Sequence, residues 1–207
     1  MRFVILGGVA AMVLSAAPAL AKPPTPAQLA EAVLTPEDLG DGYSENSKHP
    51  REALDKDAAH TKACRKAISR LRPLLRSKAA AWIDKQGKPS GLRQFALGAT
   101  PAGLASWQAA GKAMVRDCAG VDKSTKKRKE GIKRLSVGRV GTWVYAIRYS
   151  DHPQEFARPI HAQDVVLMRV GQAVTLVVSD GYFGTFDPAL SRRAARLAAA
   201  KLKAAQG

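Results

Sequence analysis

The two cysteines of this chain, Cys64 and Cys118, constrain its fold more than any other feature. Each falls on the apolar side of a segment with helical spacing, the first within residues 55–71 and the second within residues 100–118. An isolated pair of cysteines usually forms a disulfide in an oxidising compartment. We therefore predict a buried Cys64–Cys118 disulfide between two helices, with free thiols or a metal-binding pair as the alternatives.

Residues 1–21 have the three-part form of a secretory signal peptide. A positive start at Met1-Arg2 precedes the apolar run Phe3 to Leu14 and the small-residue ending Ala19-Leu20-Ala21. This run is shorter than the roughly 20 residues of a permanent membrane helix. We predict cleavage after Ala21, no transmembrane segment in the mature chain, and a secreted, extracellular protein associated with the cell envelope. A retained N-terminal anchor is the alternative.

The chain is strongly basic, with 33 Lys and Arg residues against 17 Asp and Glu residues and a net charge of +16. Such a balance favours anionic partners. Outside a cell these partners are wall polymers, lipid head groups or acidic polysaccharides rather than genomic DNA. Charge alone does not choose among them.

Residues 22–34 are predicted to form a linker and an N-terminal helix, and residues 35–207 a single domain. Apolar residues at steps of three and four predict helices, and short apolar runs between turn signals predict strands. Strands in a row with flanking helices indicate the α+β class. The predicted helices are 27–34, 55–71, 100–118 and 187–205, and the predicted strands are 79–85, 91–98, 132–137, 140–149, 165–170 and 173–179.

Three of these features together resemble the PknH-type extracellular sensor domain of actinobacteria. They are the segment Leu34-Thr35-Pro36-Glu37-Asp38-Leu39-Gly40, one cysteine on each of two helices, and the hairpin strand Asp164 to Gly171. The resemblance covers nearly the whole mature chain. It implies a twisted, mainly antiparallel sheet with flanking helices and a cleft for an unidentified ligand.

The chain also departs from the kinase-linked members of that family. Those members use two disulfides, whereas this chain can make one. We recognise neither a kinase nor a membrane segment in the sequence. Any signalling role therefore implies a separate, membrane-bound protein partner.

The densest charge lies in residues 123–134, between the Cys118 helix and the next predicted strand, which predicts an exposed loop. Such a loop would attract phosphate- or carboxylate-bearing polymers, and its binding would weaken as salt rises. A solvated segment that aids solubility is the alternative. No aromatic residue is interleaved for base stacking, so we expect no specific nucleic acid. The predicted anion-binding residues are Lys123, Lys126, Lys127, Arg128, Lys129, Lys133 and Arg134.

Three aromatic residues, Trp143, Tyr145 and Tyr149, share one face of the strand predicted at 140–149. A strand face this large needs either a helix over it or a ligand. We predict that these residues line a ligand cleft, with Arg148 and Arg169 as a charged edge. Core packing and solvated strand positions are the alternatives.

No sequence motif indicates catalysis. The chain has no Gly-x-Ser-x-Gly nucleophile elbow and no paired carboxylates in matching contexts. His60 lies four residues before Cys64, but no further His or Cys cluster completes a metal site. We expect no catalytic residue, no metal and no cofactor. The predicted function is a secreted, non-enzymatic ligand-binding or sensor-type domain at the cell envelope. An exported protein-interaction module and an unrecognised envelope hydrolase are the alternatives.

Overall fold

The computed structural model describes residues 22–46, 54 and 58–207. The predicted signal peptide and the first residues of the helix predicted at 55–71 lie outside the described residues. Among the helices that the structure describes, none combines the length and the apolar character that a bilayer span requires.

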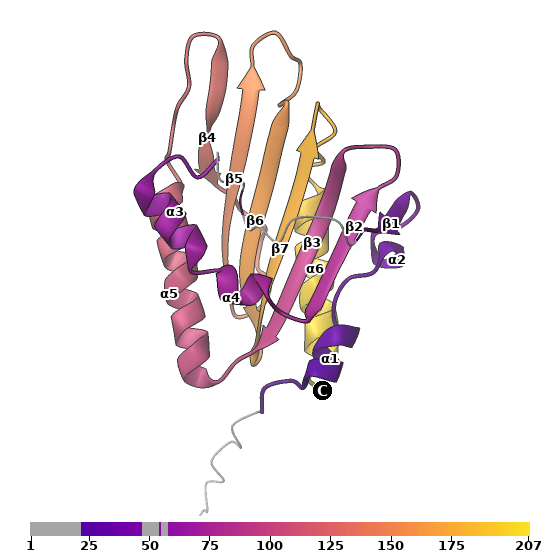
Figure 1. Cartoon of the computed structure of the whole chain (residues 1–207). Coiled ribbons are helices and arrows are strands. Elements are labelled where there is room, and N and C mark those ends of the chain that lie inside the picture. The colour runs from indigo at the N-terminus through magenta and orange to yellow at the C-terminus, as the bar shows by residue number, and fades with distance from the viewer. Residues whose placement is uncertain (1–21, 47–53, 55–57) are drawn as a thin grey trace, which may run out of the picture.

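A seven-stranded antiparallel sheet forms the centre of the molecule, in the order β1-β2-β3-β7-β6-β5-β4 (Figure 1). The last strand of the chain therefore lies in the middle of the sheet. The predicted α+β class with an antiparallel sheet and flanking helices is confirmed. The strands are β1 (Tyr43–Glu45), β2 (Ala79–Lys85), β3 (Ser90–Gly98), β4 (Arg128–Arg134), β5 (Trp143–Pro153), β6 (His161–Val170) and β7 (Ala173–Tyr182).

The β6–β7 hairpin forms where the sequence places a Gly-x pair. Gly171 has a φ of 56° and Gln172 follows it, which is the pattern of a tight type II′ turn. The aliphatic runs Val165–Met168 and Val174–Val178 are buried throughout. Both strands are therefore covered on their two faces, as their continuous apolar sequence predicted.

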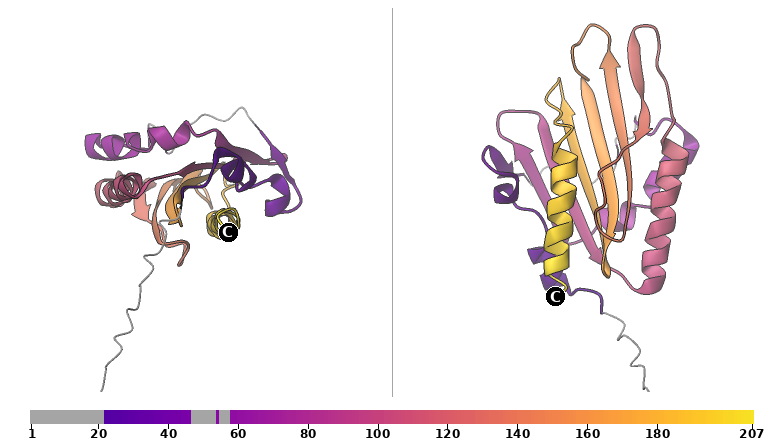
Figure 2. Two further views of the ribbon diagram at one scale, coloured as in Figure 1. Left: turned by 90° about the horizontal axis from the view of Figure 1, so that it is seen from below. Right: turned by 180° about the vertical axis from the view of Figure 1, so that it is seen from behind.

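Helices cover the two faces of the sheet unequally (Figure 2). We call the face that carries Phe95, Ile147 and Leu167 the closed face, and the face that carries Val166 and Val177 the open face. Helices α3, α4 and α5 pack on the closed face, and α6 packs on the open face. The helices are α1 (Pro26–Glu31), α2 (Pro36–Leu39), α3 (Lys62–Ser69), α4 (Arg72–Leu75), α5 (Pro101–Cys118) and α6 (Leu190–Ala204).

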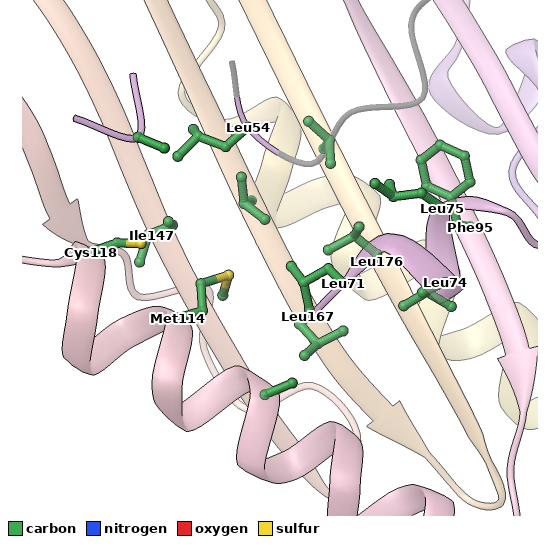
Figure 3. Packing of buried hydrophobic residues seen from close by; sticks show 14 of the residues in the cluster. Leu54, Leu71, Leu74, Leu75, Phe95, Met114, Cys118, Ile147, Leu167 and Leu176 are labelled. Atoms are coloured by element: carbon green, nitrogen blue, oxygen red, sulfur yellow. The ribbon is translucent and has the colours of Figure 1, made fainter. Parts of the chain in front are cut away.

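The predicted disulfide is confirmed, and it joins two helices of the closed face. Cys64 of α3 and Cys118 of α5 are fully buried, with their Cα atoms 4.6 Å apart. Around them, Met114, Ile147 and Leu167 belong to the largest apolar cluster (Figure 3). The disulfide therefore fixes α3 to α5 on this side of the sheet.

Helix α6 packs closely on the open face because small residues line its inner side. Ala194, Ala195 and Ala198 are completely buried there. The sequence predicts Asp187 as the cap and Pro188 in the first turn of this helix, but the helix begins at Leu190, after a turn that contains Pro188. Asp187 Oδ1 accepts the backbone N–H of Ala189 at 2.9 Å, so Asp187 caps that turn instead of the helix.

Several other predicted boundaries were also wrong: α1 ends at Glu31, β6 begins at His161 and β7 ends at Tyr182. Helix α3 begins at Lys62, because Thr61 Oγ1 accepts the backbone N–H of Cys64 at 3.0 Å and caps the helix. The strand predicted at 132–137 is β4, which lies earlier and includes more charged residues. The strand predicted at 140–149 is β5, which runs on to Pro153.

Candidate functional site

A groove of about 800 Å³ lies on the open face, at the end of the sheet where α6 begins. The β2–β3 turn, the β5–β6 loop and the turn between β7 and α6 form its walls. Six charged residues line it: Lys85, Lys88, Lys133, Arg148, Arg158 and Asp187.

The turn between β7 and α6 folds back over the sheet because residue 181 is glycine. A Cβ at Gly181 would lie 2.5 Å from the Cα of Phe186, which is too close for non-bonded atoms. This approach places Phe186 beside Arg148, whose guanidinium carbon lies 5.0 Å from the centre of the ring. The arrangement is a cation–π contact and orients both side chains at the groove wall.

A chain of hydrogen bonds below the groove fixes Arg148. Its Nε and Nη2 donate to the two carboxylate oxygens of Asp164 at 2.6 and 2.8 Å, and the Asp164 side chain is fully buried. The hydroxyl of Ser191 donates to the same carboxylate and lies 2.7 Å from the hydroxyl of Ser179. Because a guanidinium has five N–H groups, the bidentate pair leaves donors for a ligand.

In the described part of the chain, the other cations of the groove have no carboxylate partner of this kind. Among the described residues, no carboxylate forms an ion pair with Lys85, Lys88, Lys133 or Arg158. Asp187 lines the groove, but its carboxylate already accepts a backbone N–H. Positive charges that converge on a concave surface raise the local potential. The charge of the groove is therefore complementary to that of a phosphate or carboxylate group.

The basic segment 123–134 does not form one exposed loop, contrary to the prediction, because its second half is strand β4. Side chains alternate along this strand, so Arg128 pairs with the buried Asp151 while Lys133 lines the groove. Lys and Arg on an edge strand also discourage pairing with another chain. Of the predicted anion-binding set Lys123, Lys126, Lys127, Arg128, Lys129, Lys133 and Arg134, the structure places Lys133 in the groove.

The predicted aromatic cleft residues lie on the closed face, away from the groove. Trp143 and Tyr145 are partly buried against the core cluster, with ring centres 5.5 Å apart. Helix α5 approaches them closely at Gly111, where a Cβ would lie 2.4 Å from Tyr145 Cδ2. A helix therefore covers this strand face. Arg169 lies opposite Trp143 in the sheet register, and its Nε donates to the carbonyl oxygen of Gly171 at 2.7 Å.

Tyr149 is 4% exposed and belongs to a polar cluster on the closed face. Its hydroxyl donates to Glu130 Oε1 at 3.0 Å, and the same oxygen lies 2.9 Å from Nε2 of His60. Burial raises the pKa of the Tyr149 phenol, and the Glu130 carboxylate raises it further. The phenol therefore stays protonated and acts as a donor. Of the five predicted ligand-binding residues, Arg148 alone lines the groove, and ligand contact by the other four remains a prediction.

The metal alternative considered for His60 and Cys64 does not fit the structure, because the Cys64 sulfur is in the disulfide. The described residues contain no group of three or more His, Cys, Asp and Glu side chains that could hold a metal ion.

Sequence reasoning missed Lys85, Lys88 and Arg158 as groove residues. The turn that follows Lys85 was predicted, and Gly87 has the expected positive φ of 66°. The sequence does not show, however, that this turn lies beside the β7–α6 turn, because the two segments are far apart in the chain. Arg158 lies in a loop without any recognisable pattern.

No protein-family model and no curated protein sequence matches this chain. Among solved structures, it is similar to the crystal structure of the extracellular domain of PknH from Mycobacterium tuberculosis. The similarity has a TM-score of 0.49 and 13% sequence identity, and it covers 89% of this chain and 97% of that chain. We base no argument on a similarity of this size, and membership of the PknH-type family stays a prediction.

Proposed function

We propose that this protein is a secreted, non-enzymatic binding domain of the sensor type, and that its open-face groove binds a water-soluble anionic ligand. The ligand class is a small molecule or wall polymer that carries phosphate or carboxylate groups. Any signal would pass to a separate membrane-bound protein. The observation that carries the proposal is the convergence of five cations on one groove, four of them without an ion-pair partner among the described residues.

Arg148 is the residue best suited to orient such a ligand. Its guanidinium is fixed by Asp164 and by the ring of Phe186, so its remaining donors point in a defined direction. The lysines at positions 85, 88 and 133 carry long, flexible side chains and would supply attraction rather than orientation. Binding at such a site weakens as ionic strength rises.

The test is calorimetric titration of the protein with polyphosphate and with poly-glutamate, at low and at high ionic strength. We expect salt-sensitive binding that weakens about tenfold in the variant Lys85→Gln/Lys88→Gln/Lys133→Gln, because each exposed charge contributes up to about 1 kcal/mol. The three side chains are not core residues, so thermal stability should stay near that of the wild type.

The matched control is Lys62→Gln/Lys112→Gln/Lys203→Gln. It removes the same charge from exposed positions on α3, α5 and α6, outside the groove. Equal losses in both triple variants would mean that net charge, and not the groove, attracts the ligand. Undiminished binding in the groove variant would likewise overturn the proposal.

A further inference from the structure

Two phenylalanines stand out from an otherwise polar surface. Phe156 is 50% exposed and Phe183 is 80% exposed, and no other large hydrophobic residue in the described part of the chain is exposed. Phe183 also has a φ of 51°, a conformation that no other described residue except glycine adopts. A bulky residue in this region is strained, and such strain often marks a functional position.

The two rings lie on loops that backbone hydrogen bonds hold together. The N–H of Phe183 donates to the carbonyl oxygen of Ile160 at 2.7 Å, and the N–H of Gly184 donates to that of Pro159 at 3.1 Å. These bonds tie the turn after β7 to the loop between β5 and β6. Both rings therefore belong to the same end of the sheet, the upper end in Figure 1.

Basic loops surround this pair. The N–H of Gln154 donates to the carbonyl oxygen of Lys127 at 2.9 Å, which places the 123–127 loop beside the loop of Phe156. The N–H of Tyr182 donates to the carbonyl oxygen of Pro89 at 3.0 Å, which places the β2–β3 turn beside Phe183. Five exposed cations belong to these three loops: Lys88, Lys123, Lys126, Lys127 and Arg158.

We propose that this end of the sheet docks on an anionic lipid bilayer. Phe156 and Phe183 would enter the head-group region, and the surrounding lysines and Arg158 would neutralise lipid phosphates. Both rings are exposed on loops at one end of the sheet, so they can reach a surface that this end meets. Proteins that stack nucleic-acid bases on aromatic rings hold those bases in a groove or on a sheet face instead. The proposal shares Lys88 and Arg158 with the open-face groove, but it does not require the groove's ligand, because the two phenylalanines do not line the groove.

The test is co-sedimentation of the wild-type protein with vesicles of phosphatidylglycerol and phosphatidylcholine, and with vesicles of phosphatidylcholine alone. We expect binding to the anionic vesicles only, weakened by salt. The variant Phe156→Ser/Phe183→Gly should bind at least about tenfold more weakly, since it loses the apolar contribution of both rings. Glycine at position 183 removes the backbone strain, so unfolding temperature should not fall.

Calorimetric titration with polyphosphate separates this proposal from the one for the groove. The Phe variant should bind polyphosphate as the wild type does. Undiminished vesicle binding by the Phe variant, or an absence of wild-type binding to anionic vesicles, would overturn the bilayer proposal. A single-stranded oligonucleotide that binds the wild type but not the Phe variant would assign the rings to base stacking and would also overturn it.

Discussion

The two faces of the sheet differ in their charged residues, although each contains an ion pair with a buried carboxylate, which on the open face is Arg148–Asp164. On the closed face, charges pair with one another inside the protein: Arg93 and Asp180 are both buried with their charged atoms 2.5 Å apart, and Arg128 pairs with Asp151. On the open face, α6 covers one end and leaves the other to a groove lined by cations (Figure 2). Both faces carry part of the apolar core, but the groove on the open face is lined by cations without an ion-pair partner among the described residues, and there we propose the ligand site.

The largest expected effect is the loss of stability when the disulfide of the closed face is removed. Replacing both cysteines, Cys64→Ala/Cys118→Ala, should lower the free energy of unfolding by about 4 kcal/mol, because the disulfide closes a separation of 54 residues. Urea denaturation measures this change. Where the variant remains folded, the groove should bind polyphosphate unchanged. A large loss of affinity would show that the faces are coupled.

The second prediction concerns the support of the groove. Asp164→Ala should lower the free energy of unfolding by about 3 kcal/mol. Loss of a carboxylate from a fully buried ion pair would cost more, but the Arg148 side chain is 27% exposed. Polyphosphate should then bind more weakly, because the guanidinium loses the contact that orients it. The matched control is Asp117→Ala, whose partner Arg116 is 72% exposed, and there the loss of stability should be much smaller because solvent screens the pair. Denaturant unfolding and calorimetry give both quantities.

The third prediction tests how tightly the closed face is packed. Gly111→Ala should lower the free energy of unfolding by about 1–2 kcal/mol, since the new methyl group meets the ring of Tyr145. Gly103→Ala, on the same helix, meets nothing closer than 3.4 Å and should be neutral or stabilising. Equal effects at both positions in thermal unfolding would contradict the proposed packing contact.

The smallest effect is expected at the ion pair that ties α2 to α6. Burial acts to raise the pKa of Asp38, but hydrogen bonds from Lys201 and the Thr35 backbone outweigh it, so the pKa lies below its ordinary value of 3.8. The pair therefore stabilises the fold above that pH and loses its effect as pH falls through the lowered pKa. Asp38→Asn should lower the free energy of unfolding by about 0.5–1 kcal/mol at neutral pH. The difference from wild type should vanish in acid, as urea denaturation across pH would show.

Much of the fold could be predicted because its signals are local. The turn at Gly171 and the amphipathic spacing around Cys118 depend on neighbours in the sequence, and each appears where it was expected. Strand β4 was misplaced because its pairing with β5 satisfies the backbone of a highly charged segment that has little β-propensity. Tertiary pairing, rather than local preference, decides such an edge strand.

The groove was less predictable because it arises from segments that meet only in the folded protein. Arg148 was identified from its strand, but its partners Asp164 and Phe186 come from β6 and the turn after β7. The exposed position of Phe183 could not be predicted either, because a phenylalanine at the end of an apolar strand usually belongs to the core.

The central place of β7 has a consequence for how the protein reaches its structure. Strands β1 to β3 and strands β4 to β6 form two groups that are joined through β7. One hydrogen bond between β7 and β3, which the Thr175 hydroxyl donates to the carbonyl oxygen of Phe95, joins residues 80 positions apart in the sequence. Such distant contacts form slowly, because a long loop must close first. Until residues 173–182 are available, each group keeps an open strand edge, so the newly made chain is most exposed to aggregation just before its last strand is added.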